Sequence, residues 1–135
     1  MDMQNLAYAV TQIVHNFGAV AVVGSAACAL WPGCATMRKS LAWIMLAGWA
    51  VQAASGAAFG GISWLYYGNF PDIHGVAIAA LLVKVTCAAA GFILAAVYLY
   101  KEATWSEPAQ QNIWRVLVVL AVTALSAAAF LRWFS

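Results

Sequence analysis

The chain has 135 residues, of which 66% are hydrophobic and 7% are charged, and its net charge is +2. A soluble domain carries about 25% charged residues, and no soluble fold of this size could bury so much apolar surface, so the composition predicts an integral membrane protein. The small charge, with no basic run, argues against nucleic-acid binding.

Four apolar stretches follow one another along the chain, at about residues 6–31, 41–66, 74–100 and 113–134. Each is long enough to cross the hydrocarbon as a helix, which takes roughly 20 residues. Short connections make neighbouring helices antiparallel. The sequence therefore predicts an all-α fold, one antiparallel bundle of four transmembrane helices over residues 1–135. The longest connection, 101–112, is polar and contains Pro108, so we expect a loop there.

Lysine and arginine near the ends of the stretches indicate the orientation, because cytoplasmic loops are enriched in both. The second connection has only the acidic Asp72, and one positive residue, Arg132, lies on the same side. The positive residues that flank the first and third connections are Arg38, Lys39, Lys101 and Arg115. We therefore expect a multi-pass protein of the cell inner membrane with both termini in the periplasm.

The first stretch carries Gln12 and His15, which share one helical face with Ala19. An ionisable residue inside the hydrocarbon costs about 2.5 kcal/mol or more, so it usually faces a cavity, a partner or a cofactor. A flat ligand could lie along this face. The alternative is a histidine hydrogen-bonded at a helix interface, with Asn16 or Gln52 as its partner.

The second and fourth stretches add weaker features. Gly56 and Gly60 form a GxxxG step, which admits either a neighbouring helix or a flat macrocycle. Arg132, near the end of the fourth stretch, suits a haem propionate, since arginine pairs well with carboxylates. Its alternative role is to reach the membrane interface with its charged head.

The third stretch begins at His74 and holds Lys84 about ten residues further on. The expected topology puts His15 and His74 on the same outer side, where two imidazoles can bind one haem iron from opposite faces. Lys84 has no acidic partner inside any stretch. It would pair with a carboxylate of a cofactor or substrate, relay protons, or contact a helix of a partner subunit.

The three cysteines, Cys28, Cys34 and Cys87, are scattered along the chain. No two of them form a CxxC pair, and an odd, scattered set argues against a disulfide framework or a zinc site. We therefore expect them to be small packing residues.

Three segments, HNFGAVAVVGSAACALW, LAGWAVQAASGAAFGG and LLVKVTCAAAGFILA, resemble the first three helices of small four-helix haem membrane proteins. This group includes the copper resistance protein D family and the HemJ-type protoporphyrinogen oxidases. The resemblance lies in a histidine of the first helix followed by small residues, and in a lysine inside the third helix. It implies that His15 is a haem ligand and that Lys84 is a functional residue.

Together these features favour a b-type haem protein for electron transfer, a cytochrome b-like subunit of a respiratory or oxidoreductase complex. It would pass electrons between quinone and a periplasmic carrier, in contact with the lipid bilayer and other membrane subunits. We expect His15 and His74 to bind the iron. The other residues expected around the haem or a quinone are Arg132, Lys84, Gln12 and Gly56. One alternative is a non-catalytic accessory transmembrane subunit. The other is a copper or metal transporter, which is less favoured because the chain lacks clusters of methionine and histidine.

Overall fold

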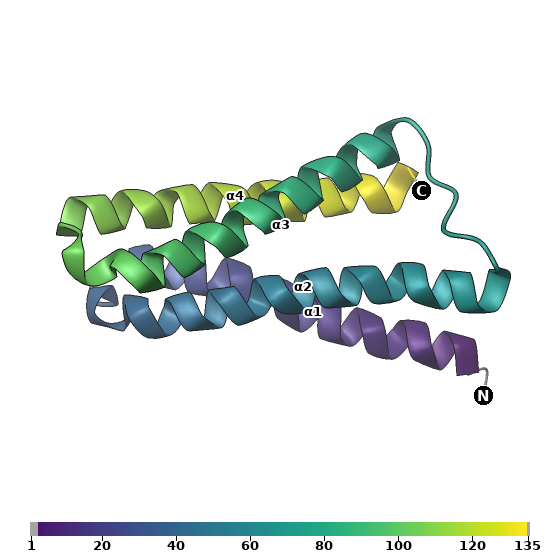
Figure 1. Ribbon diagram of the computed structural model, residues 1–135, viewed down its shortest axis with the longest axis horizontal. Helices are drawn as coiled ribbons and strands as arrows, with labels where there is room; N and C mark the ends of the chain where they lie inside the picture. The colour runs from purple at the N-terminus through teal and green to yellow at the C-terminus, as the bar shows by residue number, and fades with distance from the viewer. Residues whose placement is uncertain (1–2, 135) are drawn as a thin grey trace.

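The computed structural model describes residues 3–134, which form four long helices. The elements are α1 (Met3–Leu30), the short 3-10 turn η1 (Ala35–Met37), α2 (Arg38–Tyr67), α3 (Val76–Lys101), the 3-10 turn η2 (Glu102–Thr104) and α4 (Glu107–Phe134). The helices alternate in direction, so the two ends of the chain lie at the same end of the bundle (Figure 1). All four are long and apolar enough to cross a membrane. The prediction of an all-α, multi-pass membrane bundle is confirmed.

The connection between α3 and α4 is shorter than the sequence predicts. The expected loop over 101–112 is wrong, because α4 already begins at Glu107 and Pro108 lies in its first turn. Proline is well tolerated there, since the first backbone N–H groups of a helix have no intrahelical acceptor. The side chain of Gln110 closes the turn by donating to the backbone oxygen of Glu102 at 2.9 Å.

The buried core lies towards the end of the bundle that holds the α1–α2 and α3–α4 connections. α1 packs mainly on α2 and α3 mainly on α4, and the two pairs diverge towards the end with the termini (Figure 1). All the buried residues of α1 lie from Gly18 onwards. The most completely buried large side chains are Trp114, Tyr98, Met45 and Leu117. The half of the bundle beyond the core therefore has few fully buried side chains.

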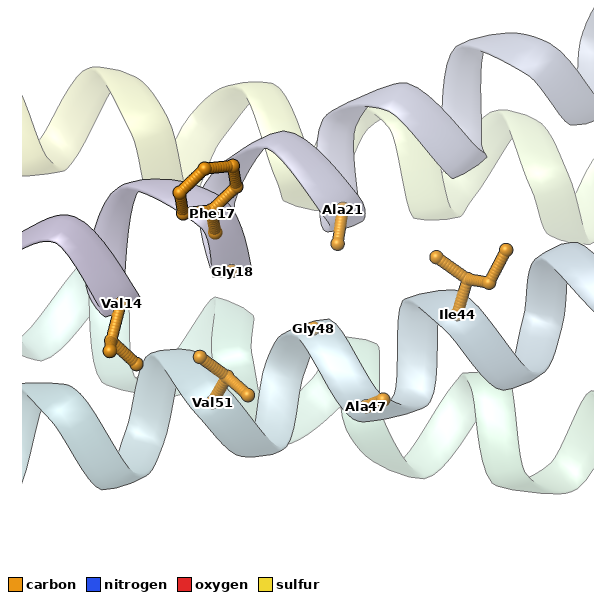
Figure 2. Close-up of a pocket in the computed structure, with 8 residues that line it drawn as sticks. All are labelled: Val14, Phe17, Gly18, Ala21, Ile44, Ala47, Gly48 and Val51. Atoms are coloured by element: carbon orange, nitrogen blue, oxygen red, sulfur yellow. The ribbon is translucent and has the colours of Figure 1, made fainter.

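Two glycines bring α1 and α2 into close contact. A Cβ atom on Gly18 would lie 2.9 Å from Cγ1 of Val51, and one on Gly48 would lie 2.9 Å from Cγ2 of Val22. Only glycine fits at these two positions without displacing a neighbour. Beside this contact the two helices leave an apolar groove of about 410 Å³ (Figure 2). The groove is lined by Val14, Phe17, Gly18, Ala21, Ile44, Ala47, Gly48 and Val51.

Charged residues join three helices at the closely packed end. Arg38 is buried, and its Nε donates to the backbone oxygen of Ala29 at 3.1 Å, while its Nη1 donates to Oε1 of Glu107 at 2.5 Å. α2 is thereby tied to the last turn of α1 and the first turn of α4. A second, more exposed ion pair joins Lys39 to Glu102 at 2.7 Å. Arg38, which served in the sequence only to indicate the orientation in the membrane, thus also links α2 to α1 and α4.

Candidate functional site

The polar centre of the bundle is a contact between a histidine of α1 and a lysine of α3. Nζ of Lys84 lies 2.9 Å from Nε2 of His15, and both residues are half-buried. Across residues 3–134, no carboxylate pairs with this ammonium group. Because an ammonium group is a donor only, Lys84 donates and Nε2 of His15 accepts. The structure thus brings together two of the residues singled out in the sequence.

A serine of α2 determines which nitrogen of the His15 imidazole carries the hydrogen. Oγ of Ser55 lies 2.7 Å from Nδ1 of His15 and 2.5 Å from the backbone oxygen of Val51. The hydroxyl has one hydrogen, which it donates to Val51, so Oγ accepts from Nδ1–H. This assignment, made from the hydrogen-bond network, leaves the lone pair on Nε2, facing Lys84.

Further contacts hold the histidine from both sides. The side-chain amide of Gln52 donates to the backbone oxygen of His15, and the ring of Phe59 meets the imidazole edge-on at 5.7 Å between centroids. Gln12 bonds to Asn16, one turn along α1, at 2.7 Å, and so is occupied within its own helix. Gln52, which the sequence offered as an alternative partner of the imidazole, contacts the backbone of His15 instead. The imidazole of His15 has Ser55 and Lys84 as its hydrogen-bond partners.

The second histidine does not reach the first. His74 lies in the segment before α3, its side chain is 77% exposed, and its Nε2 is 3.3 Å from a carboxylate oxygen of Asp72. At about 1.5 Å per residue, Lys84 lies about 12 Å along α3 from its first residue, Val76. Because His15 contacts Lys84, the two imidazoles are at different depths. The described residues do not fit a haem held by His15 and His74 together.

Gly56 and Arg132 also lie apart from the described contacts of the histidine–lysine pair. Gly56 is exposed on α2, and a Cβ there would meet no atom within 4 Å, so no helix approaches closely at this glycine. The close approach of α1 and α2 occurs at Gly18 and Gly48. Arg132 is exposed in the last turn of α4. Neither residue is among the hydrogen-bond partners of His15 or Lys84.

Sequence reasoning missed Ser55, because serines inside transmembrane helices usually bond only their own backbone. The signal available in the sequence was its spacing from Gln52. Residues three apart share one helical face, so two polar side chains at this spacing point to the same neighbour. Here that neighbour is His15, which bonds to both.

The pair offers hydrogen-bond donors and a base inside the membrane. An ammonium group has three N–H donors, of which Lys84 uses one on His15, and the other two have no acceptor within residues 3–134. In the same part of the chain, no group of three or more histidine, cysteine, aspartate or glutamate side chains gathers around a metal position. No protein-family model, curated protein or solved structure matches the chain.

Proposed function

We propose that the protein is a membrane-embedded redox protein whose cofactor site is the hydrogen-bonded pair of His15 and Lys84. One observation supports this above the others: a lysine and a histidine meet inside the bundle, 2.9 Å apart, with no described acid beside them. Burying such groups is costly and is compensated when they bind a ligand. A ligand with an acceptor oxygen would use the two remaining donors of Lys84.

The cofactor we propose first is a b-type haem held through one histidine of this chain. Ser55 holds the imidazole with Nδ1 protonated, the tautomer that metal-binding histidines adopt when their second nitrogen donates to a neighbour. Nε2 is then the nitrogen that would bind the iron. Lys84 would turn from Nε2 to a propionate. When bound, such a haem supplies one-electron transfer.

A quinone bound directly to the pair is the second candidate. It is favoured by the present bond from Lys84 to Nε2, because iron binding requires this bond to be replaced whereas quinone binding leaves it in place. A quinone carbonyl accepts hydrogen bonds from the two free donors of Lys84. The protein would then exchange protons at the pair as electrons enter or leave the quinone.

The topology we propose places the core end of the bundle in the cytoplasm. Arg38, Lys39, Lys101 and Arg115 lie at that end, and the positive-inside rule assigns such an end to the cytoplasmic side. Both termini would then lie in the periplasm, and the inner membrane would be the host membrane. The diverging half of the bundle, with the histidine–lysine pair at its base, would open towards the periplasm and a carrier there.

An optical spectrum of the detergent-purified protein, oxidised and then reduced, tests the proposal. With haem supplied during expression, we expect a Soret band and sharp reduced α and β bands that are lost in His15→Ala. The matched control is His74→Ala, which should keep them because this histidine is exposed and away from the pair.

The remaining outcomes separate the two cofactors. A colourless protein from which a quinone is extracted in organic solvent, with less quinone in Lys84→Met, would favour the second candidate. A protein that holds neither haem nor quinone would refute a redox cofactor site. It would leave the accessory transmembrane subunit as the better interpretation.

A further inference from the structure

Two thiols meet at the opposite end of the bundle from the termini. Cys28 lies in the last turn of α1, and Cys34 lies in the connection directly before η1. Their Sγ atoms are 3.4 Å apart, and both cysteines are free and half-buried. The third cysteine, Cys87, is buried in α3 and belongs to the apolar core. The sequence interpretation of all three as packing residues overlooked this contact.

The backbone of the connection places the two thiols together. The N–H of Trp31 donates to the oxygen of Cys28 at 3.0 Å, and the N–H of Cys34 donates to the oxygen of Trp31 at 3.1 Å. Gly33, between them, has a φ of 91°, a left-handed conformation that glycine adopts without strain. Two successive turns thus reverse the chain, which brings side chains six residues apart into contact.

The donor set suits a disulfide better than a metal. A structural zinc site takes four ligands. Within residues 3–134, no third histidine, cysteine, aspartate or glutamate joins the two sulfurs in a metal-binding group. The hydrogen bond with Cys28, with a smaller contribution from burial, raises the pKa of the Cys34 thiol. The pair is therefore held as two neutral thiols, the reduced form of a dithiol.

We propose that Cys28 and Cys34 form a reversible dithiol–disulfide site that reacts with low-molecular-weight or protein disulfides. Cys34 first loses its proton to a base in the surrounding buffer, and its thiolate attacks one sulfur of the incoming disulfide, while the other sulfur leaves as a thiolate. Cys28, after losing its proton to solvent, attacks Sγ of Cys34 in the mixed disulfide and releases the second thiol. Two electrons pass from the cysteine pair to the incoming disulfide, which becomes two thiols.

The oxidised site would fasten the connection to α1 beside an existing link between helices. Ala29, the neighbour of Cys28, accepts the hydrogen bond from the buried Arg38, which in turn pairs with Glu107 of α4. A covalent bond from Cys28 to Cys34 would hold the last turn of α1 against the start of α2. Oxidation therefore acts on the closely packed end of the bundle and is independent of the histidine–lysine pair.

The experiment uses the purified full chain in detergent, equilibrated in mildly alkaline glutathione buffers that range from reduced to oxidised. Free thiols are then trapped with a maleimide, and the intact mass is measured. In Cys87→Ser, we expect Cys28 and Cys34 to lose their thiols together, with the chain still monomeric and without bound glutathione. Peptide mapping of the oxidised wild type should recover residues 28 and 34 in one linked pair, which tests the site without any substitution.

The matched control is Cys28→Ser combined with Cys87→Ser. Without Cys28 to resolve it, a glutathione adduct should persist on Cys34. The proposal is overturned if both thiols of Cys87→Ser remain free in the most oxidised buffer. It is equally overturned if the adduct on Cys34 persists when Cys28 is present, or if the linked peptides come from two chains.

Discussion

Replacing Gly91 by alanine should destabilise the bundle, because α3 passes directly over a tryptophan of α2 at this residue. A Cβ atom on Gly91 would lie 2.5 Å from Cε2 of Trp49, 2.6 Å from Nε1 and 2.7 Å from Cζ2. All three atoms belong to one rigid indole ring. The tryptophan is 3% exposed, so the ring has no solvent or lipid side into which it can swing.

The size of the effect follows from how far the ring must move. Restoring ordinary contact distances requires a shift of about 1 Å of the ring or of α3, and overpacking of this kind typically costs about 1–3 kcal/mol. Alanine is the better helix former by up to about 1 kcal/mol, which offsets part of that cost. We therefore expect Gly91→Ala to lower the free energy of unfolding by about 1–2 kcal/mol.

Reversible unfolding by sodium dodecyl sulfate in mixed micelles, followed by circular dichroism, measures this difference. The matched control is Gly24→Ala on α1, where an added Cβ would meet no atom within 4 Å, so no loss is expected. The smaller ring of Trp49→Phe should relieve the clash, and combining it with Gly91→Ala should recover stability beyond the sum of the single changes. If Gly91→Ala is as stable as Gly24→Ala, the close contact between α2 and α3 is refuted.

Two further predictions concern the polar contacts of the bundle. Glu107→Ala leaves the buried charge of Arg38 without its counter-ion and should cost about 1–3 kcal/mol in the same unfolding assay. Lys39→Ala, which breaks the more exposed ion pair with Glu102, should cost measurably less. Equal effects of the two changes would contradict this ranking. Ser55→Ala removes the acceptor for Nδ1–H of His15 and should weaken retention of the proposed haem roughly 10- to 100-fold, measured by loss of its Soret band on dilution. Unchanged retention would mean that the serine does not orient the imidazole.

The sequence identified the costly residues inside the membrane but not how they pair. His15 and Lys84 stand out because each interrupts an apolar run. Their contact depends on the relative depth of α1 and α3, which no local pattern encodes. The same missing information made His74 the expected partner, because the topology puts it on the correct side of the membrane. Its depth, in the exposed segment before α3, separates it from His15.

The glycines illustrate the same limit. Gly56 and Gly60 have the spacing of a helix-packing motif, yet the glycines that bring α1 and α2 together are Gly18 and Gly48. A spacing motif describes one helix alone, whereas a close contact needs small residues on two helices at one level. The contact of Cys28 with Cys34 was equally hidden, since it depends on the turn between them.

Composition alone predicted a membrane protein, because a soluble fold of 135 residues cannot bury the apolar surface of a chain that is 66% hydrophobic. The length of the apolar runs determined four helices, and short connections made them antiparallel. Only the tertiary structure decided the chemistry of the interior. Hydrogen bonds have a reach of about 3 Å, so which polar side chains meet depends on the depth and rotation of whole helices, which packing between them fixes. The pair of His15 and Lys84 and the serine that orients the imidazole come from that packing. The contact of the two thiols comes from the fold of the connection between α1 and α2.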